Sequence, residues 1–175
     1  METFWNILQV SLPALLVGGI VWLMMAKFAE QENQRRRWQL LRTTQQTALP
    51  IRFTAYERMV IFLERITPDC MMVRLQDNAL TAKQFHASLL VDIRAEYEHN
   101  VSQQLYMSDE AWTVVKNAKE SIVQLVNACA AQLPPDAPSM DLAKLILATY
   151  GEASQASPTE TAIEVLKQEI KNYFA

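Results

Sequence analysis

Residues 3–26 constrain the fold more than any other part of the sequence, because none of these 24 positions carries a charged residue. With a rise of about 1.5 Å per residue, an α-helix of this length spans about 36 Å. The hydrocarbon core of a bilayer is about 30 Å thick, so such a helix crosses it with some tilt. We therefore expect a transmembrane anchor at residues 1–27, with a cleaved signal peptide or a peripheral helix as alternatives.

The charges that flank this segment predict its orientation. Glu2 precedes the segment, whereas Lys27, Arg35, Arg36 and Arg37 follow it. Basic residues concentrate on the cytoplasmic side of membrane helices. The sequence thus predicts a single-pass protein of a bacterial inner (plasma) membrane, with its N-terminus outside and about 150 residues in the cytoplasm.

Small residues and a proline interrupt the apolar segment. Pro13, Ala14, Gly18 and Gly19 fall in its middle, and Ala14 and Gly18 have small-xxx-small spacing. Such residues let two membrane helices approach closely. They indicate a helix–helix contact with another integral membrane subunit, although glycine is also common in membrane helices that make no such contact.

Residues 28–50 follow as a polar, basic juxtamembrane stalk that we expect Pro50 to end. The stalk contains the cluster Arg35, Arg36, Arg37 and Trp38. One interpretation is contact with anionic lipid or with phosphate, including the RNA of a membrane-docked particle. The other is that the cluster only sets topology and is otherwise solvated.

The composition of the whole chain predicts an all-α fold. Half of the 175 residues are hydrophobic, and there are only three glycines and seven prolines. These values argue against disorder and against a turn-rich β fold. The net charge of −3 argues against a general nucleic-acid binder. The two cysteines are far apart and form no CxxC motif, which favours two reduced thiols over a disulfide or a metal site.

Apolar spacing and capping residues divide the cytoplasmic part into a core helical domain (residues 51–132) and a C-terminal helical pair (residues 133–175). We expect helices at residues 51–67, from 81 through 105, at 109–131, at 140–150 and from 158 onward. Thr81, Ser108 and Ser157 are the expected N-caps, and Gly151 the expected C-terminal stop. Residues 71–75 form a short apolar run that suits an extended segment. The second and third helices should form an antiparallel hairpin.

Glu96 and His99 have the Glu-x-x-His spacing that carboxylate-bridged di-metal bundles use. The sequence holds only one other histidine, so the motif is half present and we expect no metal, cofactor or catalytic residue. Pairing with Arg58, Arg65 or Arg94, or with a partner chain, is the favoured interpretation. Tyr106 and Trp112 near the hairpin tip fit either a binding edge or the core.

Two sequence blocks resemble a known family. AYERMVIFLERITP (residues 55–68) and IRAEYEHNVSQQLYMSDEAW (residues 93–112), followed by KNAKE, are similar to an uncharacterised family of small single-pass inner-membrane proteins of Bacteroidota. The resemblance covers about residues 51–131, with the anchor ahead of it. It implies a domain of unknown function and transfers no catalytic or binding residue.

These observations favour a non-enzymatic accessory or scaffold subunit of a larger membrane complex, with a cytoplasmic helical interaction domain. A membrane-tethered enzyme or metal-binding domain that uses Glu96 and His99 is the first alternative. A basic adaptor that holds RNA, a ribosome or anionic lipid at the membrane through residues 35–37 is the second.

Overall fold

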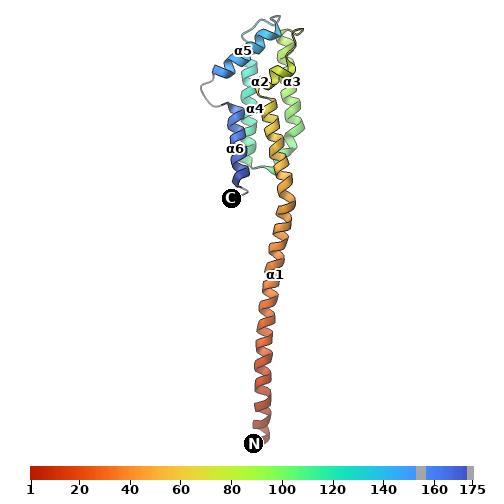
Figure 1. Ribbon diagram of the computed structural model, residues 1–175, viewed down its shortest axis with the longest axis vertical. Coiled ribbons are helices and arrows are strands. Elements are labelled where there is room, and N and C mark those ends of the chain that lie inside the picture. Colours follow the sequence, from red (N-terminus) through yellow and green to blue (C-terminus); the bar gives the residue numbers. More distant parts are fainter. Residues whose placement is uncertain (153–156, 173–175) are drawn as a thin grey trace. The chain divides into compact units, whose positions relative to one another are not determined.

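A computed structural model describes residues 1–152 and 157–172, and the described part of the chain is all-α (Figure 1). Within the first helix, the side chains at residues 2–16, 18, 19, 29, 33, 34 and 36–47 are not described. The helices are α1 (Glu2–Arg65), α2 (Pro68–Leu75), α3 (Ala82–Asn100), the 3₁₀ helix η1 (Val101–Tyr106), α4 (Asp109–Ala130), α5 (Ser139–Glu152) and α6 (Pro158–Asn172). The chain divides into two compact units, Met1–Leu49 and Pro50–Ala175.

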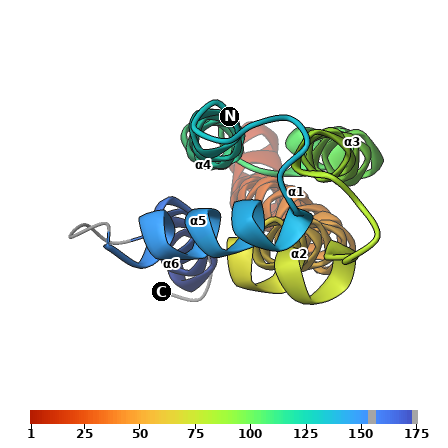
Figure 2. The same ribbon diagram turned by 90° about the horizontal axis from the view of Figure 1, so that it is seen from above.

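The second unit is a helical bundle. The last part of α1 runs alongside α3, α4 and α6, while α2 and α5 cross one end (Figure 2). Helix α4 packs against α3, α5 and α6, and α3 also packs against α5. The hairpin of α3 and α4, predicted from the short link between them, is present. Helices α5 and α6 pack on the same core as α3 and α4.

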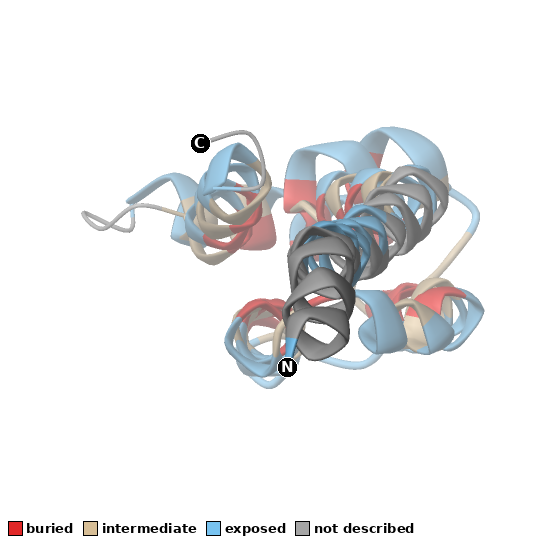
Figure 3. Ribbon diagram, turned by 90° about the horizontal axis from the view of Figure 1, so that it is seen from below, coloured by how far each residue is buried: buried red, intermediate tan, exposed pale blue. Residues whose placement is uncertain are grey.

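The end of α1 supplies one wall of the hydrophobic core. Its buried residues recur three or four positions apart, which is the spacing of one helix face. They are Ala55, Tyr56, Met59, Phe62, Leu63 and Ile66. Phe85, Leu89 and Ile93 of α3, Val115, Ile122 and Val126 of α4, and Leu142, Ile146 and Leu166 of the last two helices share this core. Figure 3 shows the buried residues facing the interior of the bundle.

Local capping signals predicted the helix starts correctly. The Thr81 side chain accepts from the Gln84 amide, and the Gln84 side chain accepts from the Thr81 amide, which completes a capping box. The Ser108 hydroxyl accepts from the Ala111 amide at the start of α4. Ser157 caps α6 with Pro158 at the first helical position.

The proline-rich link before α5 completes the cap of α3. The amides of Ala82 and Lys83 donate to the carbonyls of Ala137 (2.7 Å) and Pro135 (3.3 Å). The buried Ser139 hydroxyl donates to the Asp77 carbonyl at 2.6 Å. These bonds satisfy amides that the first turn of a helix otherwise leaves unpaired, so the link and α3 stabilise each other.

Pro50 behaves differently from the prediction, whereas the helix before Pro68 ends close to the predicted boundary at residue 67. Pro50 does not end a helix, because α1 continues through it to Arg65. Proline costs one backbone hydrogen bond and a steric clash, but burial of the face that follows offsets this cost. Pro68 starts α2, where a missing amide hydrogen has no cost. Residues 71–75 are therefore helical rather than extended.

Two further boundaries also differ. The helix that begins after Thr81 was expected to run through residue 105, but it stops at Asn100 and gives way to η1, in which Leu105 is 78% exposed. Helix α5 runs past Gly151 to Glu152, and none of the described glycines has a positive φ. Gly151 thus does not form the left-handed cap that its position suggested.

Among the described residues, no helix combines the length and the apolar character that crossing a bilayer requires. The anchor expected at residues 1–27 stays a prediction.

A cluster of hydroxyl groups fixes the start of α6 to the bundle. The Thr159 hydroxyl, almost fully buried, lies 3.1 Å from the Tyr150 hydroxyl, 2.9 Å from that of Ser157 and 3.2 Å from that of Thr67. Tyr150 also bonds directly to Ser157. At the other end of α6, Glu169 accepts from the amide and hydroxyl of Ser108. Hydrogen bonds therefore tie both ends of α6 to the bundle.

Replacing Thr159 by valine should lower the free energy of unfolding by about 1–2 kcal/mol, because it keeps the side-chain shape but leaves buried hydroxyl partners unsatisfied. Urea denaturation followed by circular dichroism measures this change. Thr161→Val, at an exposed position of the same helix, is the matched control and should change stability by less than about 0.5 kcal/mol. Equal effects of the two substitutions would contradict a structural role for the cluster.

Candidate functional site

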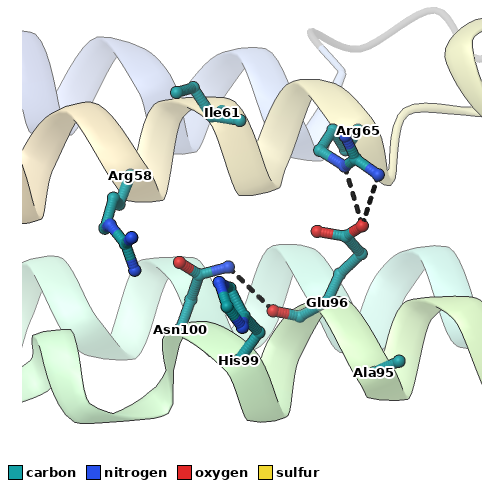
Figure 4. A pocket seen from close by; sticks show the side chains of 7 residues that line it. All are labelled: Arg58, Ile61, Arg65, Ala95, Glu96, His99 and Asn100. Atoms are coloured by element: carbon teal, nitrogen blue, oxygen red, sulfur yellow. Dashed lines mark hydrogen bonds and ion pairs between the residues drawn. The ribbon is translucent and has the colours of Figure 1, made fainter.

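An open pocket of about 510 Å³ lies between the end of α1 and α3 (Figure 4). Its lining comes from residues one helical turn apart on each helix, since positions three or four apart share a face. They are Arg58, Ile61 and Arg65 from α1, and Ala95, Glu96, His99 and Asn100 from α3. The pocket thus gathers four of the residues that the sequence indicated for a partner contact or a polar network.

An ion pair closes one end of the pocket. Arg65 donates from Nε to Glu96 Oε1 at 2.7 Å, and its Nη2 lies 2.6 Å from the same oxygen. The Glu96 side chain is 17% exposed and that of Arg65 46% exposed. Of the three arginines considered as partners for Glu96, Arg65 is the one that pairs with it.

Arg58 and His99 occupy the other end of the pocket. Figure 4 shows both side chains directed into the space between α1 and α3. Both are exposed, and neither forms an ion pair with a described residue. Beside them, buried Asn100 donates from Nδ2 to the Glu96 carbonyl at 2.9 Å, which ties its side chain to the α3 backbone.

The charges of the pocket favour an anion over a metal cation. Two guanidinium groups line it, and the one carboxylate already contacts Arg65. A cation bound by Glu96 and His99 would lie close to Arg65 and would be repelled. Moreover, no group of three or more potential metal ligands occurs among the described residues. The free guanidinium of Arg58 suits a carboxylate or phosphate oxygen.

The remaining predicted residues of the bundle lie elsewhere. Arg94 lines a separate pocket between α3 and α4. Tyr106 is partly exposed, and its carbonyl accepts from Arg52 Nε at 2.9 Å. Trp112 is 8% exposed and stacks on Tyr97, with ring centroids 5.7 Å apart. Trp112 is therefore a core residue, and the structure does not bring the two predicted aromatic residues into the α1–α3 pocket.

The membrane-side predictions fall mostly outside the described side chains. This holds for the helix-contact residues Pro13, Ala14, Gly18 and Gly19, and for Arg36, Arg37 and Trp38 of the basic cluster. Arg35 is described and is exposed.

One ion pair that the sequence did not indicate joins α2 to α3. Arg74 donates from Nη1 and Nη2 to the two oxygens of Asp92, at 2.5 and 2.7 Å. Its Nη2 also donates to the Arg65 carbonyl at the end of α1. The hydrogen bonds to Asp92 raise the pKa of Arg74, because they stabilise the charged form of its guanidinium. No periodicity reveals this pair, because a loop separates the two helices.

A family model described as "Family of unknown function (DUF7935)" matches residues 2–173. The chain belongs to this family. The resemblance to an uncharacterised family is thus confirmed, and the match also includes the last two helices, which the two sequence blocks did not cover. No curated protein and no solved structure matches the chain.

A double-mutant cycle with Arg65→Gln and Glu96→Gln should give a coupling free energy of about 0.5–1 kcal/mol that falls with added salt, because the pair is partly exposed. Urea denaturation of the four proteins measures it. The Glu164–Lys167 pair, with its charged atoms 3.8 Å apart and both side chains more than half exposed, is the control and should give almost no coupling. Equal coupling in the two cycles would show that the pocket pair has no special role.

Proposed function

We propose that this protein is a non-enzymatic, single-pass inner-membrane accessory or scaffold subunit of a larger membrane complex. Its N-terminus faces outward, and its helical domain lies in the cytoplasm as an interaction module.

One observation supports this proposal most strongly. The six consecutive residues 20–25 of α1 are all large, apolar and exposed, as are Val17 and Phe28. Six residues make more than one helical turn, so the apolar surface surrounds the helix. A helix that is apolar on all sides belongs in a bilayer or in a large core, and the described part of the chain provides no such core here.

The charge that follows this segment supports the orientation. Lys27 and Arg35 are exposed. From Lys27 to Arg65, at the end of α1, basic residues outnumber acidic ones. The positive-inside rule then assigns the bundle to the cytoplasm. Residues 3–26 are also uncharged throughout, as a membrane anchor requires.

The bundle supports binding rather than catalysis. Its α1–α3 pocket is open and is lined by exposed Ile61 and by the guanidinium of Arg58, which has no carboxylate partner in the part of the chain that the structure describes. An apolar contact beside an unsatisfied charge is typical of a protein-binding surface. The charge of this pocket also favours an acidic group of a partner over the metal centre of a tethered enzyme.

Purification of the tagged full chain from cross-linked native membranes should recover at least one other integral membrane subunit in a constant ratio. Gly18→Leu should lower this recovery, because it fills the small-residue position expected at the helix contact. Ile20→Leu, on the opposite side of the helix from Gly18 in the same segment, is the matched control and should not. Recovery of this chain with no other protein subunit would contradict an accessory role.

A further inference from the structure

The end of α1 has a second face, opposite the core, whose side chains are exposed, although Arg65 at its end pairs with Glu96 of α3. This α1 seam consists of Ile51, Thr54, Arg58, Ile61 and Arg65, all described, at alternating spacings of three and four. Ile51 and Ile61 are 48% and 49% exposed. Residues at spacings of three and four lie along one side of a helix, so these five side chains form one continuous strip.

Charges of opposite sign border the seam on its two sides. At 100° per residue, Arg58 and Arg65 lie about 60° and 40° to one side of Ile61, toward α3. Glu57 and Glu64 lie about 40° and 60° to the other side. Both glutamates are exposed, and neither forms an ion pair with a described residue. The seam therefore has an arginine edge and a glutamate edge.

This arrangement is self-complementary in one orientation only. A two-fold axis parallel to α1 places the arginine edge of one copy against the glutamate edge of the other, twice. An antiparallel pair has its two-fold axis across the helices, which sets arginine against arginine and glutamate against glutamate. The charges thus favour a parallel pair and disfavour an antiparallel one.

The α1–α3 pocket lies on the arginine edge, where it can receive a carboxylate. Arg58 points into this pocket (Figure 4) and has no carboxylate partner among the described residues, whereas Arg65 already pairs with Glu96. In a parallel pair, Glu57 of a second copy lies at nearly the height of Arg58, because adjacent residues differ by about 1.5 Å along the axis. Arg58 and Glu57 are accordingly the dominant charge pair.

We propose that the α1 seam binds the same seam of a second copy of this chain, in parallel, with Glu57 of each copy bound by Arg58 of the other. The orientation agrees with the proposed function, on which this inference rests in one respect: two anchors in one membrane must point the same way. The residues of the seam themselves require no membrane.

Disulfide trapping in the full chain tests this pairing. Exposed Cys70 is first replaced by serine, while buried Cys129 is kept. In that background, Ile61→Cys places the new thiol beside its own counterpart across the two-fold axis. Oxidation with copper phenanthroline in native membranes should then yield a covalent homodimer. Gln124→Cys, at an exposed position of α4, is the matched control and should yield little.

Charge variants test the orientation. Glu57→Arg should lower the yield of the homodimer trapped through position 61 by about fivefold or more, because it removes two symmetric ion pairs and adds repulsion. The swap Glu57→Arg with Arg58→Glu restores opposite charges across the axis and should restore the yield. Each charge variant is made in the Ile61→Cys protein.

Equal homodimer yields at positions 61 and 124, cross-linking of position 61 to a different protein alone, or failure of the swap to restore the yield would overturn the parallel pair. These outcomes leave the proposed accessory role intact, since that role is measured by recovery of another membrane subunit. Conversely, a trapped homodimer recovered without any other subunit would support the pairing and contradict the accessory role.

Discussion

The structure of the bundle depends on the last turns of α1, which must bury one face and expose the other. The buried face, from Ala55 to Ile66, is the surface on which α3 and the last two helices complete the core. Burial of several large side chains there outweighs the cost of Pro50 within the helix. Because an α-helix has two sides, the same turns also present Arg58, Ile61 and Arg65 outside the core.

This geometry explains why the candidate site lies beside the core and not within it. The ion pair of Arg65 with Glu96 joins α1 to α3 at one end of the pocket, and the pair of Arg74 with Asp92 joins α2 to α3 nearby. Glu96 and Asp92 of α3 are thus already paired with other arginines. The charge of Arg58 is therefore not neutralised by either of them. At one end of the pocket, the charge of Arg65 is partly neutralised by Glu96. At the other end, Arg58 is exposed and positively charged, which suits recognition of an acidic group.

Sequence reasoning was reliable where the interaction is local. The caps of Thr81, Ser108 and Ser157 are confirmed because each uses groups within three residues. It was wrong about Pro50 and about residues 71–75, since tertiary packing decides whether a helix continues through a proline and whether a short apolar run is helical. For Glu96, sequence reasoning gave three arginines or a partner chain as the possible ion-pair partners. It could not choose Arg65, because that choice depends on how two helices pack.

The central claim is that the segment near the N-terminus spans the membrane, so that residue 2 and the helical bundle lie on opposite sides of it. Labelling intact cells with a membrane-impermeant maleimide tests it most directly, by comparing Glu2→Cys in a Cys70→Ser chain with native Cys70, which is exposed on the bundle. The account predicts that position 2 reacts in intact cells, whereas Cys70 reacts only after the membrane is permeabilised. If both positions react in intact cells, or if both react only after permeabilisation, residue 2 and the bundle lie on the same side of the membrane. That result would contradict the account.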